Sequence, residues 1–272
     1  MTIFSDRTFS QKLERTEART SVDLIESRKI LFPEVGAEWI EVAGVFAMFD
    51  GAESPLTQTF GLGVCSEITN KELDEIEAFF KRHNAPVFHE VSPMADPSLL
   101  GLLNERGYRP VELTSVMFLP LDAEDEINLP TNPNIQTRII GADEIDIFAK
   151  TAVTGWSAEM PEFESFGLGL CKISANSKSA SSFMAEIEGV PVATGTLFIC
   201  EDVGELGGAS TIPEGRRKGA QNALLAARLN YARGKGCKIA MMGALPGSQS
   251  QRNAEKNGFR IAYTRTKWQL KN

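Results

Sequence analysis

The stretch ASTIPEGRRKGAQNALL, residues 209–225, joins a β-rich run to an alanine-rich helical run and decides the fold. Pro213 ends the strand-like run, because proline lacks the N–H group that a sheet ladder needs. A helical pattern begins near Ala220, directly after a glycine. Backbone N–H groups at a helix N-terminus attract anions, and a glycine there allows close approach. The stretch therefore predicts a pyrophosphate-binding loop, to which charge is added by Arg216, Arg217 and Lys218.

Two better-known phosphate-binding loops do not fit this stretch. No Gly-Lys-Ser/Thr follows, so it is not a Walker A loop, and it lacks the GxGxxG spacing of a dinucleotide site. Taken alone, the loop is equally compatible with a basic surface turn that starts an ordinary helix. The elements on either side of the stretch are needed to distinguish a phosphate-binding loop from such a turn.

The composition describes a globular chain with an acidic surface. The chain has 272 residues, 42% of them hydrophobic, which suits one large domain or two of ordinary size. The formal charge of −8 opposes nucleic-acid binding and favours positively charged acceptors such as amines. Four scattered cysteines without a CxxC pair argue against a zinc site and against a disulfide framework. We expect a cytoplasmic protein without a metal.

No apolar run reaches eighteen residues, and the N-terminus lacks the apolar core of a signal peptide, so we expect no membrane association. In the first half of the chain, the pattern predicts one or two helices over 10–29 and strands over 38–49 and 56–64. It also predicts a helix over 69–84, capped by Thr69 or Asn70. A strand over 86–91, a helix over 97–107 and a strand over 111–121 follow.

The second half predicts a similar series of elements. These are a strand at 135–140, a helix at 142–156, a Gly/Ser-rich polar loop, a hairpin at 181–199 that turns at Glu188 and Gly189, and a strand ending at Pro213. The sequences at 102–118 and 253–269 form a weak repeat. An acidic, Pro- and Asn-rich segment, Asp122–Ile135, predicts a linker. We therefore expect two related domains, 1–130 and 131–272.

The order of elements around the quoted stretch resembles the acetyl-CoA-dependent GNAT acyltransferase superfamily over roughly residues 135–270. The family signature Gln/Arg-x-x-Gly-x-Gly/Ala is met by Arg216 and Gly219, whereas Gln221 replaces the last small residue. The resemblance implies an α/β fold (α+β in some schemes) with two GNAT-like mixed sheets flanked by helices. It also implies a splayed pair of parallel strands in the second domain, the first domain being degenerate.

By the same resemblance, acetyl-CoA binds as co-substrate at the end of the strand, on the loop and on the next helix. The main chain of Ser210, Thr211 and Ile212 would contact the pantetheine arm, and residues 216–221 would wrap the pyrophosphate. Gly247 stands where many members have an asparagine, so nearby polar residues would replace it. The expected cofactor contacts are Ser210, Thr211, Ile212, Arg216, Arg217, Lys218, Gly219, Ala220, Gln221, Ser250 and Asn253.

Acyl transfer to an amine needs a base for its proton and a group that polarises the thioester carbonyl. Glu205 lies six residues before Thr211, a spacing at which some GNAT enzymes carry a general base; the alternative is a strand end in solvent. Gly207 and Gly208 predict a β-bulge there. The tyrosine that serves as general acid in the family is replaced by Ala254 here. Tyr263 is the nearest substitute in sequence, although a packing role for it fits as well.

Trp156 and Glu159 are the candidate residues for the acceptor amine, since an aromatic wall with carboxylates suits a cation; a loop-anchoring tryptophan with surface acids is the alternative. We expect an N-acetyltransferase acting on a small-molecule or peptide amine. Two rival functions remain open, an inactive acyl-CoA-binding regulatory protein and a nucleotide-binding protein. The oligomeric state is left open as well, a homodimer included.

Overall fold

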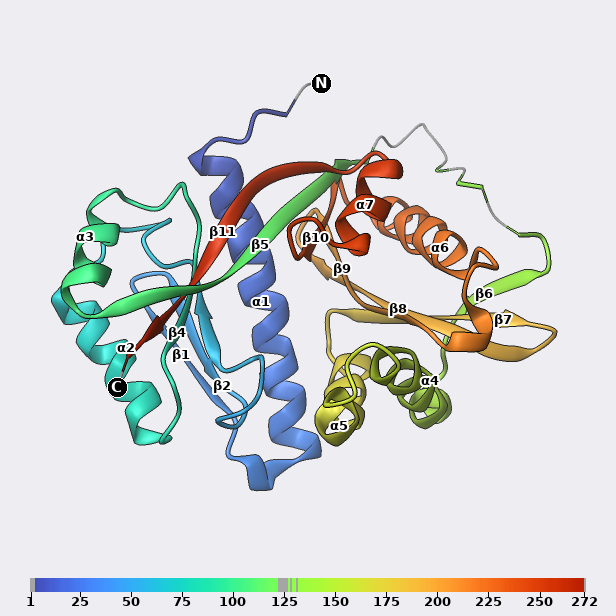
Figure 1. Ribbon diagram of the computed structural model, residues 1–272, viewed down its shortest axis with the longest axis horizontal. Coiled ribbons are helices and arrows are strands. Elements are labelled where there is room, and N and C mark those ends of the chain that lie inside the picture. Colours follow the sequence, from blue (N-terminus) through green and yellow to red (C-terminus); the bar gives the residue numbers. More distant parts are fainter. Residues whose placement is uncertain (1–2, 122–126, 128, 131, 272) are drawn as a thin grey trace. The chain divides into compact units, whose positions relative to one another are not determined.

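The computed structural model describes residues 3–121, 127, 129–130 and 132–271 (Figure 1). Its contacts group the chain into a first unit, residues 1–118 with 243–272, and a second unit, residues 119–242. This grouping differs from a division between residues 130 and 131, because the last thirty residues pack with the N-terminal half. Much of the predicted linker, namely 122–126, 128 and 131, lies outside the described residues. The division into domains 1–130 and 131–272 stays a prediction.

The sheet of the first unit takes its strands from both ends of the chain. The last strand, β11, lies between β4 and β5 and is antiparallel to both of them. Only the pair β3 and β4 is parallel among the pairs described in this unit. The strand order is β1 (Glu38–Val42), β2 (Val45–Phe49), β3 (Gln58–Phe60), β4 (Phe88–Val91), β11 (Arg260–Leu270) and β5 (Tyr108–Pro120).

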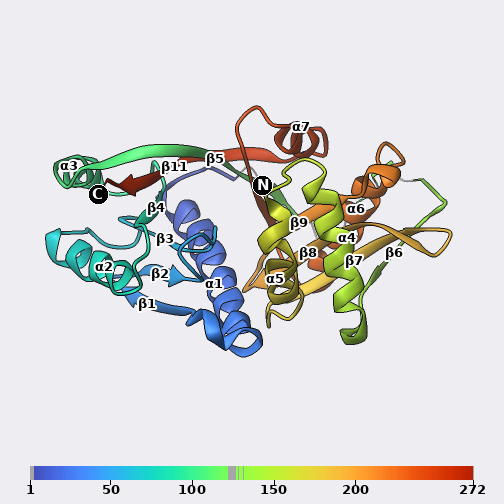
Figure 2. The ribbon, with the colours of Figure 1, turned by 60° about the horizontal axis from the view of Figure 1, so that its bottom comes forward.

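Helices cover both faces of this sheet. Strand β2 is buried at every position, because Phe46 and Met48 pack towards α1 (Arg7–Leu31), whereas Val45, Ala47 and Phe49 pack towards α2 (Asn70–Arg82) and α3 (Ser98–Glu105). Figure 2 shows these strands between α1 and α2. The region expected to form one or two N-terminal helices is one helix of 25 residues. The fourth helix of this unit is α7 (Gln249–Lys256).

The second unit contains a mixed sheet in the order β10-β9-β8-β7-β6, and only β9 and β10 are parallel among its described pairs. Figure 1 shows α4 and α5 on one face and α6 on the other. The mixed α/β class expected from the sequence is therefore confirmed. The elements are β6 (Ile135–Ile139), α4 (Ile145–Ser157), α5 (Phe163–Ala175), β7 (Ala180–Ile187), β8 (Val190–Cys200), β9 (Val203–Thr211), α6 (Ala220–Gly234) and β10 (Ile239–Ala244).

Two local predictions in this unit have opposite outcomes. The hairpin of β7 and β8 turns at Glu188 and Gly189, both with positive φ, as predicted. The Gly/Ser-rich loop expected after Trp156 was a wrong prediction, because much of it forms helix α5. A Cβ atom on Gly167 would lie 2.4 Å from the Phe163 ring and 3.1 Å from Val153 of α4. The glycine lets α5 pack closely on α4, and its low helix propensity hides the helix in the sequence.

Within the described residues, no helix combines the length and the apolar character needed to cross a bilayer.

Candidate functional site

The predicted phosphate loop leads into the N-terminus of α6. Pro213–Gly215 form one 3-10 turn, after which Arg217 (φ +61°) and Gly219 (φ +94°) both adopt left-handed conformations. Gly219 is the N-cap of α6 and supplies no side-chain cap. The first N–H groups of a helix have no acceptor within the helix. Because the N-cap residue of α6 has no side chain to accept from them, these groups are, among the described residues, available to an anion, and the 15-residue helix adds the positive end of its dipole.

Helix α2 of the first unit corresponds to α6, because it precedes β4, α3 and β5 as α6 precedes β10, α7 and β11, and its N-terminus is capped. The Thr69 hydroxyl accepts from the Lys71 N–H at 3.3 Å, and the Glu72 carboxylate accepts from the Thr69 N–H at 2.9 Å. In the preceding loop, the Val64 carbonyl accepts from the side chains of Arg7 and Gln11 on α1. The capping box therefore satisfies N–H groups at the start of α2 from within the chain. This contrast favours one anion site per chain, at α6.

The basic residues of the loop differ in how they are held. Arg216 donates to the carbonyls of Thr211 (3.4 Å) and Gly155 (3.3 Å), and it lies 3.1 Å from a carboxylate oxygen of Glu159. Its guanidinium therefore links the loop to the end of α4, a contact that the sequence did not predict. Arg217 and Lys218 are exposed.

The end of β9 offers fewer groups than expected. The Ile212 N–H donates to the Val192 carbonyl of β8, so this N–H is not available to the pantetheine arm. The Ser210 hydroxyl is buried and donates to the Ala152 carbonyl at 3.0 Å. Backbone groups alternate along a strand, so those of Thr211 face the opposite edge. Gln221, expected at the cofactor, instead donates to the Thr211 hydroxyl at 2.7 Å and ties α6 to β9.

Strands β9 and β10 pair over a short length only. Their described register runs from Val203 opposite Ile239 to Glu205 opposite Met241, whereas β9 continues to Thr211. The parallel strands therefore part beyond Glu205, as a splayed pair would. The half-buried Glu205 lies at the point of parting, where a base for the predicted reaction would be needed.

The predicted bulge is present next to Glu205. In the pairing of β8 with β9, Thr194 lies opposite Ser210 and Thr196 lies opposite Gly207, so two residues of β9 face the single Gly195. Gly208, one of the two, has φ +60°. Such a bulge turns backbone N–H groups out of the ladder, and the prediction made from the glycine pair is confirmed.

The expected acceptor residues lie at the C-terminus of α4. Trp156 is half-buried and packs on Phe163 of α5, with ring centroids 5.9 Å apart. Glu159 is exposed and forms the ion pair with Arg216. The structure thus brings the acceptor candidate Glu159 to the cofactor candidate Arg216. Trp156 also anchors the turn, since its carbonyl accepts from the N–H groups of Glu159 and Met160.

Gly155 is a residue of this region that sequence reasoning missed. A Cβ atom there would lie 2.7 Å from the Ser210 hydroxyl oxygen and 2.9 Å from the Thr211 backbone nitrogen. Helix α4 can approach the end of β9 only with glycine at this position. The available signal was a glycine inside an otherwise good helical pattern, which often marks close packing.

Tyr263 does not lie in the second unit. It belongs to β11, is buried, and donates its hydroxyl hydrogen to Glu14 of α1 at 2.8 Å. Burial, together with the Glu14 charge, raises the pKa of Tyr263 well above its ordinary value. These contacts support the packing role and not the general-acid role.

The remaining expected residues lie on α7, in the first unit. Ser250 and Asn253 are exposed, and the Asn253 side chain accepts from Gln249 at 2.7 Å. Their contact with a cofactor stays a prediction. Ala254, at the position of the family's tyrosine, is buried.

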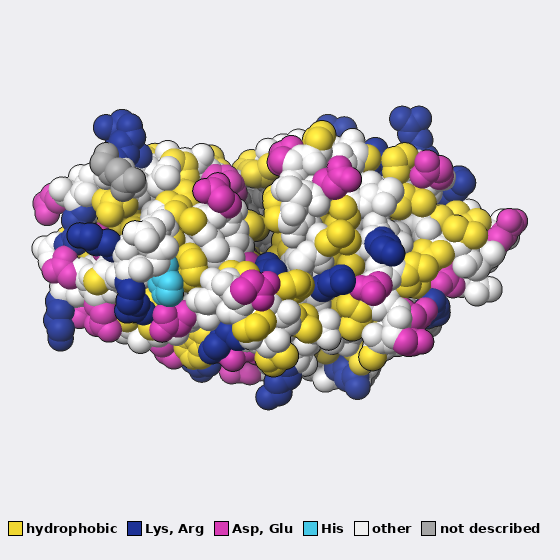
Figure 3. All heavy atoms as spheres, turned by 90° about the horizontal axis from the view of Figure 1, so that it is seen from below, with side chains coloured by type: hydrophobic (Ala, Val, Ile, Leu, Met, Phe, Trp, Pro, Cys, Tyr) yellow, Lys and Arg dark blue, Asp and Glu magenta, His cyan; other side chains and the backbone are white. Residues whose placement is uncertain are grey.

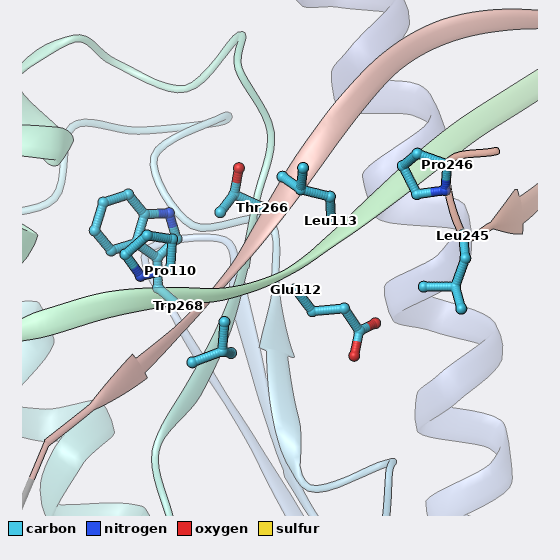
Figure 4. A pocket seen from close by; sticks show the side chains of 8 residues that line it. Pro110, Glu112, Leu113, Leu245, Pro246, Thr266 and Trp268 are labelled. Atoms are coloured by element: carbon cyan, nitrogen blue, oxygen red, sulfur yellow. The ribbon is translucent and has the colours of Figure 1, made fainter.

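A pocket of about 800 Å³ in the first unit was not predicted at all. Figure 4 shows its lining side chains beside β5 and β11, the Glu112 carboxylate among them. Its lining is mostly apolar: Pro110, Val111, Glu112, Leu113, Leu245, Pro246, Thr266 and Trp268. On the face shown in Figure 3, acidic, basic and apolar side chains are interspersed.

The comparisons with known proteins agree with this geometry. Residues 146–259 match a family model described as Acetyltransferase (GNAT) family. No curated protein gives a significant match.

Solved structures resemble the fold over most of the chain. A GCN5-related N-acetyltransferase from Kribbella flavida has a TM-score of 0.65 at 16% identity, covering 94% of this chain and 95% of that one. A functionally unknown conserved protein from Staphylococcus epidermidis has 0.61 at 12%, covering 90% and 97%. A tandem GNAT protein from the clavulanic acid biosynthesis pathway has 0.58 at 11%, covering 84% and 79%. Residues 146–259 therefore match the GNAT acetyltransferase family, and the chain has the fold of GNAT proteins.

Proposed function

We propose that the chain is an acetyl-CoA-dependent N-acyltransferase with one active site, in the second unit. The observation that carries the proposal is the uncapped N-terminus of α6 beside two parallel strands that part at Glu205. An anion-binding helix end supports binding of the pyrophosphate, and the gap between the strands supports binding of the pantetheine arm. Acetyl-CoA supplies an acetyl group activated as a thioester.

Three parts of the second unit would act on the bound reactants. The N–H groups of Ala220, Gln221 and the loop before them would bind the pyrophosphate. The N–H groups that the bulge turns out near Gly208 would polarise the thioester carbonyl. Glu205 would accept the proton of the attacking amine, directly or through one water. A thiolate leaving group needs little protonation, since thiols have a pKa of about 8.5, so the alanine at position 254 is compatible with turnover.

The acceptor that fits best is a cationic amine. The end of α4 presents backbone carbonyls and the negative pole of its dipole. Glu159 and Glu162 follow in the turn to α5, and Glu164 lies in the first turn of α5. Trp156 adds an aromatic face. Arg216 is the cation that the described contacts place there, and it is already paired with Glu159.

Binding of acetyl-CoA at α6 tests the site. Gly219→Asp adds a negative charge and a side chain at a left-handed position, so calorimetry should find acetyl-CoA affinity at least 100-fold weaker. Gly234→Asp is the matched control, because it puts the same side chain at the other end of α6 in open space. Equal affinities in the two variants would contradict the assignment. Protection by ATP rather than by CoA in thermal unfolding would indicate a nucleotide site instead.

Turnover separates an enzyme from an acyl-CoA-binding regulatory protein, a rival that the alanine at 254 keeps open. CoA release should be detectable with at least one of a panel of polyamines, amino sugars, amino acids and peptide N-termini. Glu205→Gln should lower kcat/KM by about 100-fold, the lower range for general-base groups, most strongly at low pH. It should leave acetyl-CoA affinity unchanged. Tight acetyl-CoA binding without release of CoA on any acceptor would favour the regulatory protein.

A further inference from the structure

Arg228 of α6 is a buried arginine whose described hydrogen-bond acceptors are all backbone carbonyls. Its side chain is only 3% exposed. Nε donates to the Leu224 carbonyl at 3.2 Å, and one terminal nitrogen donates to the carbonyls of Thr196 (3.2 Å) and Gly207 (3.5 Å). Burial lowers the pKa of Arg228 to about 10, which leaves it charged at neutral pH. A buried cation costs free energy, so a role beyond packing is worth seeking.

The two sheet carbonyls that Arg228 binds flank one side of the β9 bulge. Thr196 of β8 and Gly207 of β9 are register partners and form the last regular pair before the bulge. Gly195, which faces the two bulge residues Gly208 and Ala209 of β9, lies against the guanidinium. A Cβ atom on Gly195 would lie 2.8 Å from the central carbon of the Arg228 guanidinium. Arg228 therefore clamps both strands where the ladder is interrupted, and it fits because position 195 has no side chain.

We propose that Arg228 is a positioning residue of this site: its guanidinium holds the carbonyls of Thr196 and Gly207 and thereby fixes the direction of the N–H groups in the β9 bulge. This inference rests on the proposed function, since those N–H groups are the ones assigned to the thioester carbonyl. In the described register β10 does not pair with β9 beyond Glu205, so β10 does not hold the bulge in place. Without Arg228, the bulge would be held by its pairing with β8 alone. The thioester would still bind through the α6 loop, but in a less reactive orientation.

Two substitutions disturb the clamp in different ways. Arg228→Lys keeps the charge but lacks the Nε donor to the Leu224 carbonyl, and its ammonium nitrogen ends one bond short of the terminal nitrogen that binds both sheet carbonyls. Gly195→Ala keeps the arginine but displaces its guanidinium, and the end of a side chain can shift with little strain on the backbone. Arg233→Lys, on the same helix and half-buried, is the matched control.

Amide hydrogen exchange of the ligand-free protein reads the bulge directly, without any reaction. We expect at least tenfold faster exchange in the peptide covering 205–212 for Arg228→Lys and Gly195→Ala, and unchanged exchange for the control. In steady-state kinetics we expect both variants to have a kcat at least tenfold below that of wild type. Their CoA dissociation constants should stay within twofold of the wild-type value. The preference for acetyl-CoA over CoA in binding should shrink as well.

The outcomes separate this inference from the proposed function. Unchanged exchange in both variants overturns the clamp whatever the activity, and so does faster exchange with a normal kcat. If Arg228→Lys does not fold, Gly195→Ala gives the same readings. If the wild-type protein binds acetyl-CoA but releases no CoA with any acceptor, the enzyme proposal fails, and exchange together with the acetyl-CoA preference decides whether Arg228 sets the bulge.

Discussion

Glu14 is a carboxylic acid buried in the first unit, next to the last strand of the chain. One oxygen accepts from the Tyr263 hydroxyl and from Arg265, whereas the other is buried without a partner among the described residues. Arg265 also binds Glu17 and Glu90, so three carboxylates share one buried guanidinium. Burial raises the pKa of Glu14 from 4.5 to about 7, although Arg265 opposes the shift. A proton on Glu14 relieves the excess of negative charge.

This shift predicts how stability depends on pH. The pKa is higher in the folded chain than in the unfolded chain, so the contribution of Glu14 is fully present below 4.5 and is lost as the pH rises towards 7. The loss is on the order of 3 kcal/mol for a shift of this size. Glu14→Gln mimics the protonated acid and should remove this part of the decline. Urea unfolding of both proteins between pH 5 and pH 8 measures it.

A comparison of slopes decides whether Glu14 is the group responsible. Glu105→Gln, an exposed acid on α3, serves as the control and should follow the wild-type pH dependence. Identical slopes for Glu14→Gln and wild type would show that Glu14 is ionised in the fold, and the assignment would be wrong.

At the scale of elements, α2 and α6 are related helices with differently built N-termini. The Thr69 capping box satisfies α2 internally, whereas the Gly219 cap leaves α6 open. Thr69→Ala should therefore lower the unfolding free energy by about 1 kcal/mol, the usual loss for such a cap. It should leave acetyl-CoA affinity unchanged, because α2 is not assigned to the site. Denaturant titration and calorimetry on the same protein check both statements. Weaker acetyl-CoA binding would instead indicate a second cofactor site in the first unit.

Elements with local signals could be predicted from the sequence, and elements fixed by tertiary packing could not. Thr69 with Glu72 marks the start of α2, Glu188-Gly189 marks the hairpin, and Gly207-Gly208 marks the bulge, because each pattern satisfies a backbone requirement within a few residues. Helix α5 depends on Gly167 packing against Phe163 and Val153, which no short pattern reveals. The hydrogen bonds of Arg216 to Gly155 and of Arg228 to Thr196 join residues far apart in the sequence, so no short pattern reveals them either.

At the scale of the whole molecule, the weak repeat at 102–118 and 253–269 predicted two related units but not how the chain is shared between them. Each repeat folds as a short helix, a left-handed glycine (Gly107 or Gly258) and a long strand. The second of these strands, β11, nevertheless lies inside the first unit's sheet. Related strands have similar patterns, so either could occupy a given sheet position. The buried partners of Arg265 on α1 and β4 specify which one does.

The position of β11 predicts that the N-terminal half cannot fold from its own residues. A chain of residues 1–120 would leave β4 and β5 without the strand between them. The buried Glu14 and Glu90 and the half-buried Glu17 would lose Arg265, a loss of several kcal/mol for a broken buried ion pair. Joining residue 120 to 259–272 through a short Gly/Ser loop restores the strand, because Phe118 and Arg260 are register partners of an antiparallel pair. The joined chain should unfold cooperatively in urea, and the 1–120 chain should not.

Arg265→Ala in the joined chain, which keeps the same length, should abolish the transition if the ion pairs of Arg265 hold β11 in the sheet. Cooperative unfolding of 1–120 by itself, at the same midpoint, would contradict the assignment of β11 to the first unit's core.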